Sequence, residues 1–349
     1  MKTLFVLIFF SCFWVSSFAT IRTVSNIDSA AQYTTIQAAI DASNTGDSVF
    51  VSGSPINYAS FTISDKKLAV FGPGWSPNNQ AALTAKVSGC TINGAATTGS
   101  EIQGLTFIGS VSINSSNLGV NNLQFIRNKF QGIYIYVYYA VSNYLFEGNW
   151  FDNSILYDYF GYAFSNWILH NNIFYNTSNY NVYGFTGTNI LFDHNLWYGP
   201  SSGSIDCFVS CQNLMLTNNI FVRRNAANGN SSSSFQTNIT YLCVNDAPWL
   251  SNGNFDDSGN VVGLNPMMVD QTSVSNGIDN PLLNFTIASG PANNAGNDGK
   301  DMGLLYQADR VNWTRSRGVN LPFIYKMTIK SVSIVLGSDL EVTVDAKSN

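Results

Sequence analysis

The chain has 349 residues, of which 45% are hydrophobic and only 11% are charged, with a formal net charge of −5. This composition can bury a large core, but the 16 Lys and Arg residues supply no cationic patch, so we expect no nucleic-acid partner. Polarity comes instead from uncharged side chains, above all from 43 asparagines. A chain of this kind needs a fold that accommodates many amide groups.

The N-terminus, residues 1–19, is typical of an export signal. Lys2 precedes an apolar stretch from Leu4 to Val15, and Ser17-Phe18-Ala19 forms a small-x-small cleavage site. A transmembrane anchor is the alternative, but the apolar run is shorter than the ~20 residues that a span requires. We therefore expect a protein that is secreted or at the cell surface, with no membrane span and a mature chain beginning near Thr20.

One amphipathic helix is predicted, over residues 33–43, with Ile36, Ala39 and Ile40 on its apolar face. Thr34 or Thr35 is the expected N-cap, because a hydroxyl there accepts a hydrogen bond from the first turn. The strand Gly46-Asp47-Ser-Val-Phe-Val51 follows directly. Such a helix can cover the open apolar end of a repeat structure.

Internal repeats dominate the middle of the chain. Five segments share one pattern around a fixed Asn: apolar residues lie five and three places before it, and an aromatic residue lies two places after it. The segments span residues 123–130, 144–151, 167–174, 190–197 and 214–221. The Asn residues are Asn128, Asn149, Asn172, Asn195 and Asn219, at intervals of 21, 23, 23 and 24 residues. Weaker copies flank the set at residues 102–113 and 251–262.

The period predicts an all-β fold, a single-stranded right-handed parallel β-helix with coils of about 21–24 residues. Each coil accommodates three short strands and three turns, and successive coils stack ~4.8 Å apart. The Asn side chains at one turn then bond to each other along the axis as a structural ladder. A leucine-rich repeat is the competing interpretation, but the coils lack its Leu-x-x-Leu-x-Leu run and any helical segment.

The β-helix is expected over residues 20–320. A polar loop is predicted at Asn225 to Asn238, interrupting the repeat. From about Leu321 the pattern changes to two alternating strands, Lys326 to Val335 and Asp339 to Ala346, which predict a C-terminal β-hairpin extension over residues 321–349.

The chain resembles the pectin-lyase-like superfamily. The resemblance depends on the helix, the following strand, the Asn-x-aromatic coils and the segment from Ser289 to Gly303. More specifically, the chain looks like the secreted right-handed parallel β-helix repeat proteins that are common in Bacteroidetes. The resemblance covers roughly residues 20 to 305 and implies the fold. It leaves activity open, because the superfamily includes polysaccharide lyases, glycosidases, esterases, epimerases and non-enzymatic surface proteins.

The resemblance implies, for a uronate lyase, a Lys or Arg base and often Ca²⁺ held by carboxylates. Arg127 with Lys129 and Arg223-Arg224 are the basic pairs of the coils, but neither stands beside an acidic cluster on its own coil. Asp256-Asp257 lacks the His-Gly and Arg-x-Lys partners of polygalacturonase-like enzymes and is better explained as a turn. Calcium is therefore expected only if the protein is lyase-like, and no other cofactor or metal site is predicted.

One group of candidate catalytic residues follows from the period. The position two residues before each Asn is Glu147, His170, Asp193 and Thr217 in consecutive coils. These side chains are expected to point outward in one column, where His170 between Glu147 and Asp193 could act as an acid or base. The alternative is a solvated surface ladder, because exposed charge pairs arise easily and contribute little.

A second column is aromatic and predicts a substrate-binding surface. Tyr136, Tyr157 and Tyr180 lie eight residues after successive Asn residues, and Tyr134 precedes the first of them. Alternation directs Ile133 and its neighbours inward and the tyrosines outward, where flat rings with hydroxyls suit sugars. Structural stacking that stiffens the solenoid is the alternative.

Four cysteines follow the export signal: Cys90, Cys207, Cys211 and Cys243. They either remain free and buried or include a disulfide of Cys207 with Cys211 or Cys243.

The favoured interpretation is a secreted β-helix that interacts with a polysaccharide or cell-surface glycan. It could also be a lyase or hydrolase acting on an extended, uronate-type chain. A non-catalytic adhesion or structural protein is the rival, which the small number of charged residues in the coils favours.

Overall fold

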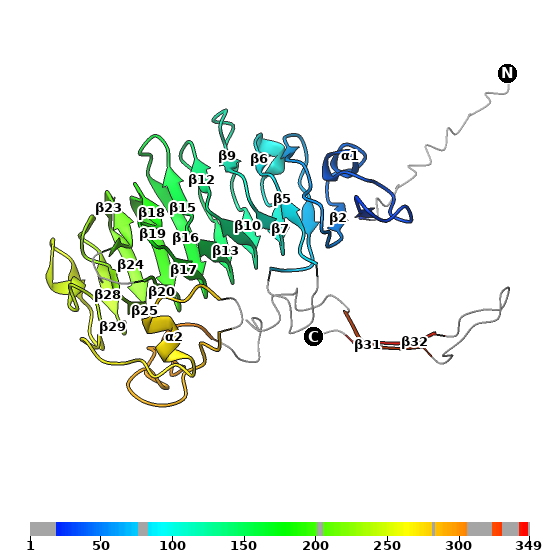
Figure 1. Cartoon of the computed structure of the whole chain (residues 1–349). Coiled ribbons are helices and arrows are strands. Elements are labelled where there is room, and N and C mark those ends of the chain that lie inside the picture. The colour runs from blue at the N-terminus through cyan, green and yellow to red at the C-terminus, as the bar shows by residue number, and fades with distance from the viewer. Residues whose placement is uncertain are drawn as a thin grey trace, which may run out of the picture.

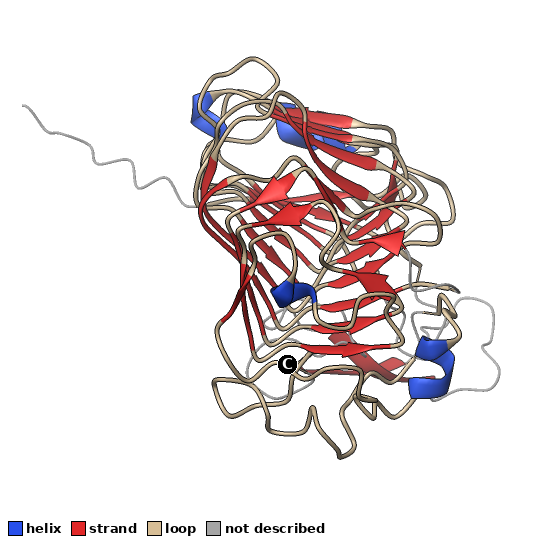
Figure 2. Ribbon diagram, turned by 90° about the vertical axis from the view of Figure 1, so that its left-hand side faces the viewer, coloured by secondary structure: helices blue, strands red, loops and turns tan. Residues whose placement is uncertain are grey.

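The computed structural model describes residues 19–75, 83–200, 205–280, 283–305, 323–329 and 342–347. Within these residues the chain forms a parallel β-solenoid whose three parallel sheets enclose one hydrophobic core (Figures 1 and 2). The predicted parallel β-helix is therefore confirmed. Nearly all of the predicted export signal lies outside the described residues.

Each coil contributes one strand to each sheet, so neighbours in a sheet are three elements apart in most of the chain. Sheet A runs through β1 (Ile21–Val24), β2 (Ser48–Val51), β4 (Ala69–Phe71), β7 (Glu101–Gln103), β10 (Gln124–Ile126), β13 (Leu145–Glu147), β16 (Phe164–His170), β19 (Gly187–Asp193), β24 (Leu214–Thr217), β28 (Ser234–Gln236) and β30 (Phe255–Asp256). Sheet B runs through β5 (Lys86–Val87), β8 (Thr106–Phe107), β11 (Lys129–Gln131), β14 (Trp150–Asp152), β17 (Ile173–Tyr175), β20 (Leu196–Tyr198), β25 (Ile220–Val222) and β29 (Ile239–Tyr241). Sheet C runs through β3 (Phe61–Ile63), β6 (Cys90–Ile92), β9 (Val111–Ile113), β12 (Tyr134–Val137), β15 (Ile155–Asp158), β18 (Val182–Tyr183) and β22 (Phe208–Val209).

The aromatic residue that follows each Asn by two places points into the core, as predicted. Phe151, Phe174, Trp197 and Phe221 are fully buried on consecutive strands of sheet B. Their rings lie in sequence, 4.6 Å apart for Phe151 and Phe174 and 3.9 Å apart for Phe174 and Trp197. Because the coils are in register, each ring covers the next and water is excluded along the axis.

The predicted Asn ladder lies between sheets A and B and is fully buried. Asn172 shows the pattern: its Oδ1 accepts from the backbone N of Asn149 at 2.9 Å and from Asn149 Nδ2 at 3.0 Å. Its Nδ2 donates to the carbonyl of Phe146 at 2.9 Å. Each ladder Asn thus satisfies backbone groups that the sharp turn would otherwise leave buried and unpaired.

The residue before each ladder Asn has a left-handed backbone conformation. Arg127, Asn171, His194 and Asn218 have φ angles of 53°, 58°, 52° and 56°, and Gly148 has a φ of 66°. This single left-handed residue turns the chain from sheet A to sheet B. Side chains at this position therefore leave the strand direction and reach over the corner of the solenoid.

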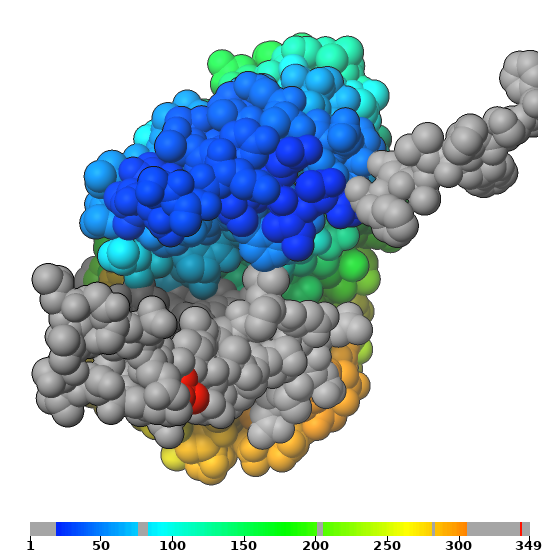
Figure 3. Space-filling view, turned by 90° about the vertical axis from the view of Figure 1, so that its right-hand side faces the viewer, coloured from blue at the N-terminus to red at the C-terminus, as the bar shows by residue number. Residues whose placement is uncertain are grey.

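The helix α1 (Ile36–Asp41) covers the N-terminal end of the coils (Figure 1). In the space-filling view of this end, the N-terminal residues are blue (Figure 3). Thr35 is its N-cap, and the Thr35 side chain accepts a hydrogen bond from the backbone N of Ala38. Ile36, Ala39 and Ile40 are buried against the first coils. The predicted capping helix and its apolar face are confirmed, although the helix is shorter than the predicted segment.

The predicted loop at 225–238 is instead another coil. It contains β26 (Arg224–Asn225), which pairs with β21 (Ile205–Asp206), then β27 (Asn230–Ser231), which pairs with β23 (Cys211–Gln212), and finally β28. Asn238 and Asn260 continue the ladder, because Asn219 Nδ2 donates to Asn238 Oδ1 at 2.9 Å and Asn238 Nδ2 donates to Asn260 Oδ1 at 3.1 Å. The prediction was wrong because this coil has few apolar residues and is held partly by hydrogen-bonded small side chains. For example, Ser233 Oγ donates to Asn230 Oδ1 at 2.7 Å.

Residues 263–280 and 283–305 no longer form coils and pack along the outer face of sheet B. Val274 in α2 (Gln271–Ser275), with Phe285 and Ile287, joins a cluster that includes Ile173 and Leu196 of that sheet. Two short 3₁₀ helices, η1 (Ala95–Thr97) and η2 (Pro248–Leu250), lie between strands. β31 (Phe323–Ile329) and β32 (Val342–Lys347) pair antiparallel.

Candidate functional site

The outer face of sheet A carries the predicted column of acid–base residues. Backbone register aligns Glu147 with His170, His170 with Asp193 and Asp193 with Thr217. All four side chains are half-buried on neighbouring strands. The period of the Asn residues therefore located this column correctly, although alignment alone assigns no chemistry to it.

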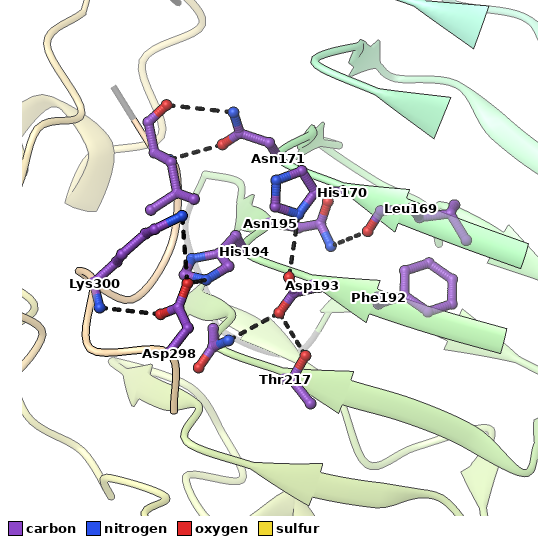
Figure 4. A network of polar contacts seen from close by, with 12 residues as sticks. Leu169, His170, Asn171, Phe192, Asp193, His194, Asn195, Thr217, Asp298 and Lys300 are labelled. Carbon is purple, nitrogen blue, oxygen red and sulfur yellow. Dashed lines mark hydrogen bonds and ion pairs between the residues drawn. The ribbon is translucent and has the colours of Figure 1, made fainter. Parts of the chain in front are cut away.

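His170 contacts Asp193, its neighbour in the column (Figure 4). His170 Nδ1 lies 3.1 Å from Asp193 Oδ2, and the imidazole side chain is 28% exposed. Asp193 Oδ1 accepts from Thr217 Oγ1 at 2.5 Å and from Asn218 Nδ2 at 2.9 Å. The carboxylate is thus held in place on one side and orients the imidazole on the other, as in acid–base dyads.

The pKa of the Asp193 carboxyl lies below its usual range. Desolvation would raise it, but the hydrogen bond from His170, the charge of His194 and the Thr217 hydroxyl outweigh burial. Asp193 is consequently ionised near neutral pH. An ionised Asp193 favours the His170 tautomer that carries its proton on Nδ1, which leaves Nε2 as a base.

His194, the second histidine of the chain, has a different role. It is 1% exposed, and its Nδ1 lies 3.0 Å from the Gly303 carbonyl. Its Nε2 lies 3.4 Å from Asp298 Oδ2, and burial lowers its pKa. Because the left-handed turn directs this ring over the corner of the solenoid, His194 anchors the C-terminal segment rather than facing solvent (Figure 4).

Residues 294–305 form a strap along the same corner, and sequence reasoning did not place it there. Asn171 bonds to the backbone of Leu305 through both amide atoms, at 2.8 Å and 3.3 Å. Asn218 Nδ2 donates to Asn297 Oδ1 at 2.8 Å, and Asn218 Oδ1 accepts from the Asn297 backbone at 2.9 Å. The Asn/Gly-rich segment that contributed to the family resemblance was the available signal, but nothing in it indicated its partners.

The outer face of sheet C carries a cluster of ten rings, here called the aromatic surface. Its members are all at least partly exposed and contact one another: Tyr134, Tyr136, Tyr138, Tyr139, Tyr157, Tyr159, Phe160, Tyr162, Tyr180 and Tyr183. Ile133, Ile135 and Val137 point inward, as predicted.

The predicted aromatic column needs one correction. Tyr136 pairs in register with Tyr157, but the third strand presents Tyr183, whose ring lies 4.4 Å from Tyr157, in place of Tyr180. Tyr180 belongs to the preceding turn, and its ring lies 5.7 Å from Tyr183. The turn after Asn172 has three extra residues, since Tyr183 follows Asn172 by 11 positions where Tyr157 follows Asn149 by 8.

Asp158 holds the most exposed part of the aromatic surface. Its Oδ1 accepts from the backbone N of Phe160 at 3.2 Å and of Gly161 at 2.9 Å. Burial raises the pKa of this carboxyl to about 6, although the backbone bonds oppose the shift. The tight turn that presents Tyr159 and Tyr162 is therefore built around a buried acid, which sequence reasoning missed because the alternation alone gives Asp158 no partner.

The two predicted groups of site residues are on different sheets. His170, Glu147 and Asp193 lie on sheet A, whereas Tyr134, Tyr136, Tyr157 and Tyr180 lie on or beside sheet C. The structure does not bring them together into one site. A glycan stacked on the tyrosines would not lie against His170, so binding and acid–base chemistry must be considered separately.

The basic residues acquire acidic partners from neighbouring coils, which the single-coil inspection could not find. Lys129 Nζ lies 2.9 Å from Asp152 Oδ2 on the next strand of sheet B. The charges of Glu147 and Glu101 act on Arg127, yet burial lowers its pKa. Arg224 is fully buried and donates to the carbonyls of Asn176, Asn179 and Asp206, so it holds the turn that contains Tyr180.

All four cysteines of the predicted mature chain are free, so no disulfide of Cys207 with Cys211 or Cys243 is present. Burial raises the pKa of Cys211 to about 12, as expected for an unreactive core thiol.

No protein-family profile matches the chain, and no curated protein is significantly similar to it. In the described part of the chain, no helix combines the length and apolarity that crossing a membrane needs.

Proposed function

We propose that this protein is a secreted, carbohydrate-binding β-helix of the pectin-lyase-like superfamily, of the type found in Bacteroidetes. Its glycan-binding site is the aromatic surface of sheet C. The parallel β-helix, the export-type N-terminus and the capping helix support the superfamily assignment. The rings of Tyr136, Tyr157 and Tyr183, outward on three consecutive strands, are the observation that supports the site.

The chemistry of these rings suits sugars. A tyrosine ring offers a flat apolar face for the C–H groups of a pyranose and a hydroxyl for its polar rim. A contiguous exposed aromatic cluster of this size is uncommon on a monomer and marks an interaction site. Because Asp158 and the packing between neighbouring rings hold the aromatic surface in place, little conformational entropy is lost on binding.

We expect replacement of Tyr136, Tyr157 and Tyr183 together by Ala to weaken glycan binding by more than about tenfold. Each stacked ring contributes about 1 kcal/mol, and tenfold corresponds to about 1.4 kcal/mol. Affinity electrophoresis or calorimetry against soluble polysaccharides measures the effect. Phe255→Ala is the matched control, because Phe255 is 58% exposed on β30 of sheet A, away from the aromatic surface. Equal binding by the triple variant and the control would reject the site.

Acid–base catalysis at His170 is a second candidate function, favoured by the 3.1 Å contact with an anchored, ionised Asp193. In this arrangement His170 Nε2 accepts a proton from water in a hydrolase or from a sugar carbon in a lyase, and Glu147 on the adjacent strand donates a proton to the departing glycosidic oxygen. The substrate would lie along sheet A beside the strap of residues 294–305.

We expect His170→Ala to abolish turnover of any glycan that the wild-type protein cleaves, while binding at the aromatic surface persists, because the two sites are on different sheets. Reducing-end release and the absorbance of unsaturated products distinguish hydrolase from lyase action. Met215→Ala, at an exposed position of sheet A, is the control. Loss of binding together with turnover, or loss of neither, would place the chemistry elsewhere. Absence of cleavage by the wild type would support the non-catalytic adhesion protein.

A further inference from the structure

We propose that the glycan held by sheet C is a neutral polymer, and that its site continues beyond the aromatic surface along Ser112, Thr91 and Thr62, here called the hydroxyl row. This inference rests on the glycan-binding function proposed above and deepens it by naming the substrate class. It replaces the expectation of a uronate-type chain.

The hydroxyl row continues the tyrosine column without a break. Register aligns Thr62 with Thr91, Thr91 with Ser112, and Ser112 with Tyr136. Thr62 is exposed, and Thr91 and Ser112 are half-buried on the same outward face. Within the described chain none of these three hydroxyls bonds to another residue, so they are free to bond to sugar hydroxyls.

The dimensions of this face suit an extended chain. Its seven strands, spaced by ~4.8 Å, extend over roughly 30 Å along the solenoid axis. The hydroxyl row is one side chain wide, and it leads into the aromatic surface at one end. A linear polymer lying along the axis contacts both halves, whereas a single monosaccharide contacts only one or two strands.

The strands of this face carry almost no charged side chains. Among the residues of its seven strands, Asp158 is the one Asp, Glu, Lys or Arg, and it is 1% exposed. The sequence has no Lys or Arg between Lys129 and Arg223, a stretch that includes the whole aromatic surface. Lys129 is paired with Asp152 on sheet B, and Arg224 is buried inside the coil.

This lack of cations selects against uronates. A polyuronate has a carboxylate on every sugar, and proteins bind such groups through Arg or Lys, often bidentately. On sheet C these carboxylates would lose part of their hydration without gaining an opposite charge. A neutral glycan loses no such hydration and gains the same stacking, so the described face favours it.

Affinity electrophoresis of the full protein with hydroxyethyl cellulose and β-mannan, against polygalacturonate and alginate, tests the substrate class. We expect binding to at least one neutral polymer that is more than about tenfold stronger than binding to either polyuronate at physiological salt. Equal or stronger binding of the polyuronates would overturn this inference and leave the glycan-binding function standing. Binding of no glycan, with a concentration-dependent dimer by light scattering, would reject both.

A charge placed on the hydroxyl row tests its location. We expect Ser112→Lys to strengthen binding of polygalacturonate about threefold, because one partly exposed ion pair is added, and to leave the fold intact. The matched control is Gln124→Lys, which adds the same charge to the outer face of sheet A on the next coil. This control should not change the binding of polygalacturonate. Equal effects of the two variants would show non-specific attraction and would remove the hydroxyl row from the site.

Discussion

Replacing Asn172 by Leu is expected to lower the free energy of unfolding by about 2–5 kcal/mol. The substitution keeps the branched shape and the number of side-chain heavy atoms but removes the acceptor for two donors of Asn149 and the donor to the Phe146 carbonyl. These groups are buried between coils, so water cannot replace the lost partners. Chemical denaturation monitored by circular dichroism measures the loss.

The exposed Asn166 provides the control for this substitution. Its Nδ2 donates to Asn143 Oδ1 at 3.0 Å in a second asparagine column, which lies at the surface. Asn166 also accepts a hydrogen bond from Asn189 Nδ2 at 3.0 Å. Because its φ is 56°, Asn166→Gly removes both side-chain bonds while it tolerates the left-handed backbone. We expect a loss below about 1 kcal/mol. Equal losses at Asn166 and Asn172 would mean that burial of the ladder contributes nothing.

Trp197→Ala is expected to cost about 3–5 kcal/mol, because it opens a cavity in the middle of the internal aromatic stack. The Trp197 ring is fully buried, lies 3.9 Å from Phe174 and 4.9 Å from Phe208, and stacks with Phe221 at 5.8 Å. Each coil contacts its two neighbours, so a cavity here weakens the stacking on both sides. Equilibrium denaturation again measures the change.

Two variants separate cavity formation from the loss of a tryptophan as such. Trp197→Phe keeps a ring in the stack and removes an indole N–H that has no hydrogen-bond partner among the described residues, so its cost should be much smaller. Phe255→Ala removes an exposed ring and should change stability by less than about 0.5 kcal/mol. A Trp197→Phe cost equal to that of Trp197→Ala would contradict the cavity explanation.

Much of the fold was predictable because one short repeat carries several constraints at once. The fixed Asn, such as Asn149, predicts a turn, and the aromatic residue two places later, such as Phe151, predicts the direction of the next strand. Repetition at a nearly constant interval then aligns one coil on another. The same arithmetic correctly aligned Glu147, His170 and Asp193, because no residue is inserted between the strand and the Asn in these coils.

The prediction was less accurate where the coil length changes. Three inserted residues after Asn172 moved Tyr183 into the position assigned to Tyr180. The Ser-rich coil from 225 to 238 was taken for a loop, because its strands are filled by hydrogen-bonded hydroxyls rather than by an apolar pattern. Turn length and polar packing leave no periodic signal, so only the folded chain reveals them.

By itself, the sequence determined the β-solenoid, its buried Asn ladder, the capping helix and the outward column of His170, since each depends on local periodicity. Only the tertiary structure decided that the strap with Asp298 meets His194, that Lys129 pairs with Asp152, and that the tyrosines and His170 face different directions. The two contacts join residues that are far apart in sequence, and the different directions of the tyrosines and His170 result from the turns between the sheets. They follow from the number of residues in each turn and from side-chain packing, which no repeat interval encodes.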